Sequence, residues 1–543
     1  MATQWQTFPI EFRGGLISNL SPLQQGSNAV GSATILQNFE SSKEGGYSKI
    51  KGFEKFSTTA VPGSGPILAL KVISSGRIVV ARQNASNVTE YYYGTGTTWT
   101  SLLDVDGITT SGIRPLLGGK AKHVLYNLNG SDKVIFVDSN NYPATYNTSG
   151  NTFTPITGST DVLGAENVAV FKDTAFYAKG NNLYFTAPFT VDDFSAANGA
   201  GSINVANEIT GLAVFRDQLI VFTTDSIKRI TGNTAADFQV APITDRIGCV
   251  NGDTIQEVGG DIMYLAPDGI RLLSATDRIG DFGLDIASDP IAKDATTFLG
   301  STPNFCSVLM REKAQYRIFA YIESEQHEAA KGLIATKFVS QGASGISWST
   351  TYGIKAFVAD SKYSGTAETV AFANTDGYVY ELDTGSGFDG LPIEAIYESP
   401  YMPLSDPQVR KSFYKMTLYA EPTGSMSLDL NVKYDFGSST NTGVIQPATQ
   451  SVESTGTSVF IFGESSSNFA QADSNDATQV DTSWPLYDST KSYATYGGEL
   501  DKIYNTNIIG SGKTIALRIE DNSTNPTFTL DTALLEFRQN DRQ

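Results

Sequence analysis

The chain has 543 residues, of which 57 are acidic and 38 basic, so its formal net charge is −19. Such an acidic chain is not expected to bind nucleic acid tightly through its overall field, because phosphate contacts need Lys and Arg to displace counterions. No apolar run reaches the length of a transmembrane helix, and the first residues do not resemble a signal peptide. The only two cysteines, Cys249 and Cys306, predict synthesis in a reducing cytosol rather than a disulfide framework.

Residues 1–63 are rich in Gly and Ser and carry scattered apolar side chains. Only Ala29–Phe39 shows a weak helical period, so we predict an irregular N-terminal arm that docks on a larger body.

From about residue 64 the sequence becomes a series of short β-runs closed by turn residues. Ile67–Val72 and Arg77–Gln83 form one such pair, and Val168–Phe171 and Thr174–Ala178 form another across Lys172-Asp173. Short turns of this type between apolar runs predict β-hairpins.

One short sequence motif recurs along the chain and indicates how the strands are arranged. Ala169–Phe176 matches Ala213–Ile220, and Ile255–Tyr264 is a looser third copy. A spacing of about 40–44 residues with several short strands per unit is typical of propeller blades. Units starting near residues 67, 123, 168, 212, 255, 306 and 356 predict a β-propeller of six or seven blades over residues 64–390. A pair of antiparallel sandwiches is the alternative.

The pattern changes after Gly390. The predicted strands that follow are Ile393–Tyr397, Lys411–Ala420, Ser427–Tyr434, Ser458–Phe462, Thr514–Glu520 and Phe528–Phe537. Alternating apolar and polar residues predict an antiparallel β-sandwich over residues 391–543, with a long Ser/Thr-rich insertion at about 437–500.

No catalytic, cofactor-binding or metal-binding constellation stands out. His123 is predicted to be a structural histidine in a strand, and after His327-Glu328 a lysine, Lys331, stands where a zinc helix needs its second histidine. The run Ile509–Thr514 ends like a phosphate-binding loop, but a strand is expected after it instead of a helix. The clusters Asp104–Gly107 and Asp473–Asp476 favour Asx turns, with a loop-bound calcium ion left open.

Several short motifs occur in a characteristic order along the chain. The opening ones are Phe12-Arg13-Gly14-Gly15-Leu16, Asn38-Phe39, Gly45-Gly46-Tyr47 and Lys51-Gly52-Phe53. Later ones are Phe171-Lys172-Asp173, Phe215-Arg216-Asp217, Phe185-Thr186-Ala187-Pro188, Pro267-Asp268-Gly269-Ile270 and Leu534-Leu535-Glu536-Phe537-Arg538. Together they resemble the tail nozzle and packaged-DNA-stabilisation proteins of tailed bacteriophages. The N-terminus is also similar to virion structural proteins of marine cyanophages.

The resemblance implies a non-enzymatic virion protein, made in the host cytoplasm, that forms a six-fold homo-oligomeric ring in the tail. Such a ring conducts or retains the genome and joins adaptor and fibre proteins. Carboxylates lining its lumen would let viral DNA pass without specific binding, and neither a cofactor nor stable membrane association is expected. The candidate inter-subunit contacts are Phe12, Leu16, Leu20, Phe39, Tyr47 and Phe53.

Two other functions stay open. The chain is alternatively a tail-tip, baseplate or neck protein that binds a host surface glycan or receptor through residues 437–500. A glycan-cleaving propeller is the third hypothesis, weakened by four Trp, two His and the lack of a repeated sialidase-type box.

Overall fold

The computed structural model describes residues 5–43, 45–102, 116–128, 130–274, 286–300, 304–340, 343–404, 406–437, 446–454, 460–461, 495–496 and 502–540. Over these residues the chain is all-β, as predicted, with α1 (Pro22–Asn28) and α3 (Ala292–Leu299) as its α-helices. None of the helices in these ranges has the length and apolarity needed to span a membrane. Short 3-10 turns are η1 (Thr160–Val162), η2 (Ala196–Asn198), η3 (Gly252–Thr254), η4 (Asp289–Ile291) and η5 (His327–Ala329).

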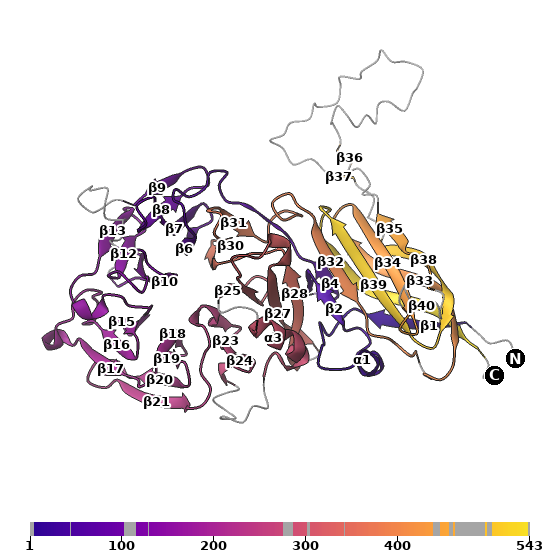
Figure 1. Ribbon diagram of the computed structural model, residues 1–543, viewed down its shortest axis with the longest axis horizontal. Coiled ribbons are helices and arrows are strands. Elements are labelled where there is room, and N and C mark those ends of the chain that lie inside the picture. The colour runs from indigo at the N-terminus through magenta and orange to yellow at the C-terminus, as the bar shows by residue number, and fades with distance from the viewer. Residues whose placement is uncertain are drawn as a thin grey trace, which may run out of the picture.

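Seven small antiparallel sheets follow one another from residue 67 to residue 382, arranged around a common centre (Figure 1). The first three comprise β6 (Ile67–Ser74), β7 (Arg77–Gln83), β8 (Thr89–Gly94), β9 (Trp99–Ser101); β10 (Lys122–Tyr126), β11 (Lys133–Val137), β12 (Ala144–Asn147), β13 (Thr152–Pro155); and β14 (Asn167–Phe171), β15 (Thr174–Lys179), β16 (Asn182–Phe185), β17 (Gly201–Asn204). The next two comprise β18 (Ile209–Phe215), β19 (Gln218–Thr223), β20 (Ile227–Thr231), β21 (Gln239–Thr244); and β22 (Gln256–Val258), β23 (Asp261–Ala266), β24 (Gly269–Leu272).

The last two sheets of the series connect to other parts of the chain. The sixth comprises β25 (Phe305–Met310), β26 (Gln315–Ala320), β27 (Lys331–Ser340) and β28 (Ala343–Tyr352), and the seventh comprises β29 (Val358–Ser364), β30 (Ala367–Ala373), β31 (Val379–Leu382) and β5 (Phe53–Lys55). Strand β29 packs against β6, so the seventh sheet returns to the first. Each of the seven predicted starting points lies in or within two residues of the first strand of a sheet.

The repeated Phe-Lys/Arg-Asp phrase forms the tight turns of two successive sheets. Lys172 and Asp173 have φ of 48° and 57°, and Arg216 and Asp217 have 46° and 62°. Positive φ at both central residues is the type I′ geometry that matches the twist of a hairpin. The Lys172 ammonium contacts the Asp217 carboxylate at 2.6 Å, so the turn of one sheet is tied to the turn of the next.

This geometry predicts opposite effects for two substitutions at Asp173. Asp173→Gly is expected to raise the free energy of unfolding by about 0.5 kcal/mol, because glycine adopts positive φ without a Cβ penalty. Asp173→Val should lower it by about 1–2 kcal/mol, because a β-branched side chain is strained there. Chemical denaturation measures both, and equal effects of Gly and Val would contradict the turn assignment.

The C-terminal strands form two groups that contribute to one large buried apolar cluster. One contains β32 (Ile393–Glu398), β39 (Ile515–Ser523), β34 (Met426–Tyr434) and β35 (Gln450–Ser454); the other contains β33 (Lys411–Pro422), β38 (Ile503–Gly512) and β40 (Phe528–Gln539). Inward side chains such as Leu430 on β34 and Leu418 on β33 belong to the same buried cluster. The short pair β36 (Phe460–Ile461) and β37 (Thr495–Tyr496) lies apart from both sheets. Most of the predicted insertion at 437–500 is outside the described residues.

The N-terminal arm is not irregular, which corrects the prediction. It contains β1 (Gln6–Glu11), β2 (Ile35–Gln37), β3 (Phe39–Ser41), β4 (Tyr47–Lys49) and β5. Strands β1 and β4 pair with β40, β2 lies between β28 and β32, and β5 pairs with β31. The sixth small sheet therefore continues through β2 into the C-terminal part as one nine-stranded sheet. These strands are too short for their alternation to be recognised in the sequence.

The arm also contains a helix, α1, which does not coincide with the weak helical period at Ala29–Phe39. Ser21 caps α1 by accepting a hydrogen bond from the backbone N–H of Gln24, and Pro22 opens the helix, a start signal that the apolar period alone misses. The weak helical period over 29–39 is overridden because Ile35–Gln37 pairs with two strands.

Candidate functional site

Five of the six predicted contact residues are buried within their own chain. Phe12, Leu16, Phe39, Tyr47 and Phe53 are all less than 5 % exposed, whereas Leu20 is 40 % exposed. A single chain does not test contacts between subunits, so their inter-subunit role stays a prediction. In this conformation Leu20 is the one of the six that a neighbour could reach.

The Tyr47 hydroxyl links two loops of the arm. Its hydroxyl accepts a hydrogen bond from the Gly15 backbone N–H at 2.8 Å and donates one to the Gly31 carbonyl at 3.0 Å. Its ring lies 5.7 Å from that of Tyr397 on β32. The buried hydroxyl therefore pins two loops of the arm onto the C-terminal part.

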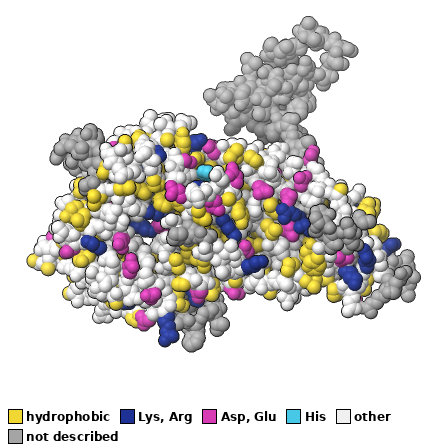
Figure 2. All heavy atoms as spheres, in the orientation of Figure 1, with side chains coloured by type: hydrophobic (Ala, Val, Ile, Leu, Met, Phe, Trp, Pro, Cys, Tyr) yellow, Lys and Arg dark blue, Asp and Glu magenta, His cyan; other side chains and the backbone are white. Residues whose placement is uncertain are grey.

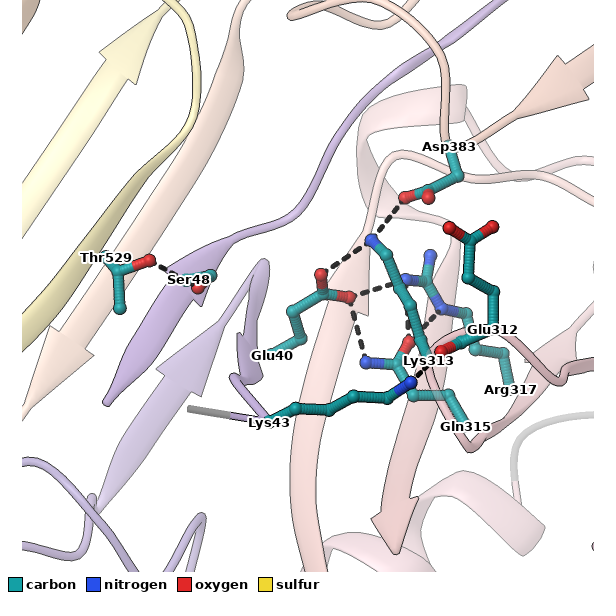
Figure 3. A network of polar contacts seen from close by, with 9 residues as sticks. All are labelled: Glu40, Lys43, Ser48, Glu312, Lys313, Gln315, Arg317, Asp383 and Thr529. Carbon is teal, nitrogen blue, oxygen red and sulfur yellow. Dashed lines mark hydrogen bonds and ion pairs between the residues drawn. The ribbon is translucent and has the colours of Figure 1, made fainter. Parts of the chain in front are cut away.

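A buried ionic network joins β3 of the arm to the sixth and seventh sheets (Figure 3). One Glu40 carboxylate oxygen contacts the Lys313 ammonium at 2.6 Å, and the other contacts the Arg317 guanidinium at 2.7 Å. Gln315 donates to the same carboxylate at 3.0 Å, and Lys313 also contacts Asp383 at 2.5 Å. Burial alone would raise the pKa of Glu40, but the charges of Lys313 and Arg317 outweigh it and hold that pKa below its usual value.

A second buried ion pair anchors β4. The Lys49 ammonium lies 2.6 Å from the Asp521 carboxylate of β39, and both side chains are essentially fully buried. Lys49 also donates to the Ser523 carbonyl at 3.0 Å. The arm is therefore tied by charge to the ring of small sheets and to the C-terminal sheets.

The main cavity of functional interest lies at the centre of the ring. Its volume is about 280 Å³, and every one of the seven small sheets, or the turn leading into it, contributes to its wall. The polar and charged lining residues are Lys71, Lys120, Lys122, His123, Asn167, Asp253, Gln256, Ser307 and Asp360. We call this the central cavity.

Two carboxylates in the wall of the central cavity, those of Asp360 and Asp253, form ion pairs with neighbouring side chains. The Asp360 carboxylate of β29 contacts Lys71 at 3.0 Å and the His123 imidazole at 3.5 Å. The Asp253 carboxylate contacts Lys120 at 2.8 Å and also Lys122. Burial lowers the pKa of both of these lysines, that of Lys120 below its usual value and that of Lys122 to about 7, where the neighbouring Lys120 charge adds to the shift.

The Asp360 contacts predict an acid-sensitive contribution to stability. Burial alone would raise the pKa of Asp360, but Lys71, His123 and the Val72 backbone N–H hold it well below its usual range. The stabilisation is therefore complete above about pH 4, the unfolded pKa, and is lost as the pH falls toward the lower folded value. Asp360→Asn should lower the free energy of unfolding at pH 7 by about 2 kcal/mol and flatten its decline below pH 4. Thermal unfolding between pH 2 and 7 measures this. Asp132→Asn, at an exposed position, is the control, and an unchanged acid limb in Asp360→Asn would contradict the prediction.

The thiols near the cavity are poor nucleophiles. Cys249 and Cys306 are both free and buried, and burial raises the pKa of Cys249 to about 11 and that of Cys306 above its usual value. Because the thiolate is the reactive form, both behave as small core residues. In the described ranges no group of three His, Cys, Asp or Glu side chains is placed to hold a metal ion.

The zinc-helix motif at His327 and the phosphate-loop motif at Ile509–Thr514 do not adopt the structures that those functions need. His327 sits in the single 3-10 turn η5, and strand β27 follows instead of a helix. Gly510 and Gly512 lie in β38, paired with β33, with β39 next in the chain. The acidic clusters Asp104–Gly107 and Asp473–Asp476 lie outside the described residues.

Sequence reasoning did not single out the lysines of the central cavity. They belong to two sheets more than 40 residues apart in sequence, and Asp253 and Asp360 come from others. The repeat period was the sequence signal that could have located the cavity residues. Residues at the start of the first strand of each repeat face the centre of the ring of small sheets.

Comparisons with known proteins do not assign the chain to a family. No family model matches it, and no curated protein matches it. Among solved structures it is similar to the extracellular domains of two putative hybrid two-component systems of B. thetaiotaomicron, BT4673 and BT3049. These are 10 % and 9 % identical over 69 % and 59 % of this chain, each with a TM-score of 0.37. The matches span 44 % and 40 % of those two chains. The AfRom2 CNH domain is 10 % identical, with 62 % of this chain and 99 % of that chain covered and a TM-score of 0.34. Scores at this level do not show a shared fold.

Proposed function

We propose that this chain is a structural, non-enzymatic component of a bacteriophage tail that assembles as a ring around the DNA exit channel. The observation that carries the proposal is the course of the arm. The segments whose motifs resemble the phage family, from Phe12 to Phe53, contribute β2, β4 and β5 to three sheets and hold the two parts of the chain together. A tail ring through which a genome passes needs such stiff subunits.

The ring of small sheets supports a seven-bladed propeller. Each sheet contributes to the wall of the central cavity, and β29 returns to β6. Strand β5 completes the seventh sheet from the N-terminal side, so strands from both ends of the series share one sheet. This closure ties the first sheet to the last and protects the edge of β31, which would otherwise be open.

The C-terminal part supports an antiparallel β-sandwich. Its two sheets bury one core between them, and β1 and β4 of the arm extend the sheet that contains β40. The nine-stranded sheet runs from the sixth blade through β2 into this sandwich. Hydrogen-bonded continuity leaves little freedom for the two parts to hinge.

The charge distribution supports passage of DNA without tight binding. The net charge is −19, and Figure 2 shows acidic and basic side chains interspersed over one face without a large basic patch. Tight binding to the DNA backbone needs a concentrated group of Lys and Arg. Virion localisation and a six-fold ring are part of the same proposal.

Assembly of the purified full chain tests this function. We expect mass photometry and negative-stain images to show closed rings of one copy number, alone or after addition of an extract of tail proteins. Leu20→Glu should reduce ring formation, whereas Leu163→Glu, at a Leu of similar exposure (38 %), should not. A chain that stays monomeric under every condition would contradict the proposal.

The receptor-binding alternative depends on residues 437–500. Most of them lie outside the described residues, so that function stays a prediction.

A further inference from the structure

We propose that the central cavity binds a small phosphate-like oxyanion, either free phosphate or the phosphate group of a small metabolite. The inference is independent of the tail assignment, because it rests on the side chains of a single chain.

The charges of the lining favour an anion. Three ammonium groups, from Lys71, Lys120 and Lys122, face two carboxylates, from Asp253 and Asp360, among the described lining residues. Burial and the Lys71 charge lower the pKa of His123, which keeps it neutral. With all three lysines protonated, the described lining carries one positive charge more than its two carboxylates neutralise. Burial lowers the pKa of Lys122 to about 7, so this excess charge is complete only below neutral pH or when an anion bound beside Lys122 favours its ammonium form.

The cavity also leaves hydrogen-bond donors for a ligand. Lys122 contacts Asp253, which leaves two of its three N–H groups for another acceptor. Asn167 lines the same cavity and is 7 % exposed, and its side-chain amide forms no hydrogen bond with any described residue. Because this amide is not among the fully enclosed side-chain atoms without a partner, it is accessible from the cavity and can donate to an anion bound there.

The three lysine side chains are partly shielded from solvent. The side chains of Lys71, Lys120 and Lys122 are 12 %, 19 % and 25 % exposed. Partly buried charges attract an anion more strongly than surface lysines do, because the effective dielectric constant is lower. A volume of about 280 Å³ is several times that of one water molecule in the liquid, about 30 Å³.

The lining argues against other ligand classes. It contains no Trp, Tyr or Phe among the described residues, so a sugar ring has no aromatic face to stack on. Its two carboxylates are both in contact with lysines, so a divalent cation would have to displace ammonium groups. A small anion needs neither an aromatic stacking face nor the displacement of an ammonium group.

Calorimetry on the full chain in phosphate-free buffer tests the proposal, with ionic strength held constant by chloride. We expect saturable binding of inorganic phosphate at one site per chain. Lys122→Gln should weaken it at least tenfold and Asn167→Ala about threefold, whereas Lys122→Arg should retain it. Lys172→Gln, on an outer turn, is the matched control and should bind as the parent does. Near-ultraviolet circular dichroism and the melting temperature show whether each variant is folded, and Lys122→Arg tests the charge if Lys122→Gln does not fold.

Glycerol phosphate and acetate distinguish the sources of the anion. Binding of phosphate alone indicates a free ion, and tighter binding of glycerol phosphate indicates a metabolite; both support the proposal. Preference for acetate, absence of saturable phosphate binding, or equal weakening by Lys172→Gln would overturn it. Because Lys122→Gln is expected to leave ring assembly unchanged, failure here is distinct from failure of the tail proposal.

Discussion

Glu40→Ala is expected to lower the free energy of unfolding by about 3–5 kcal/mol, because it leaves the buried Arg317 guanidinium without its carboxylate. Arg317 has no exposed side-chain surface and lies 2.7 Å from Glu40. Its remaining side-chain partner in the network is the Gln315 carbonyl oxygen, which does not neutralise its charge. Urea denaturation of the full chain measures the loss.

A double-mutant cycle separates the ion pair from simple loss of packing. Arg317→Met in the Glu40→Ala background should recover a large part of the lost free energy, since the unpaired charge is then absent. Lys502→Ala removes an exposed pair with Glu421, in which both side chains are about half exposed. It should cost less than about 1 kcal/mol. Equal losses for Glu40→Ala and Lys502→Ala would contradict the role given to the network.

Phe53→Ala is expected to have an effect of similar size, about 3–5 kcal/mol, because it empties the aromatic cluster that holds β5 in place. The Phe53 ring lies 5.0 Å from Phe372, 5.2 Å from Tyr380 and 5.1 Å from Phe388. Loss of this anchor should also release β5 from β31. Hydrogen exchange of the β31 amides should therefore become faster than that of β19 in the fourth sheet.

Leu20→Ala is the control for an apolar residue of the same arm. Leu20 is 40 % exposed, so its truncation should change the free energy of unfolding by no more than about 0.5 kcal/mol. If Phe53→Ala behaved like Leu20→Ala, closure of the seventh sheet by the arm would be contradicted.

The sequence was most informative where turn chemistry and alternation agree. The hairpin across Lys172-Asp173 was predictable because two apolar runs flank a two-residue turn, and the structure places both residues at positive φ. Strand β34 was predictable because its inward and outward residues alternate over nine positions. Strand β38 was missed because its Asn and Gly residues, such as Asn505 and Gly510, are typical of loops; pairing with β33 outweighs their low β-propensity.

The arm and the central cavity could not be derived from local patterns. The arm strands β2 to β5 have three residues each, and their positions depend on partners as far away as Leu530, which is 483 residues from its partner Tyr47. Glu40 is adjacent to Phe39 in a stretch without charge periodicity, and its partner Arg317 is 277 residues distant. The cavity lysines become neighbours of Asp253 and Asp360 only through closure of the ring.

Cryo-electron microscopy of the intact virus particle tests the central claim most directly, by locating this chain in the density. We predict a ring of copies around the tail axis, with the cavity-bearing ring of small sheets and the C-terminal sheets of each subunit held together by the arm. Density for the chain only on a fibre or at a distal tip, or its absence from the particle, would contradict it.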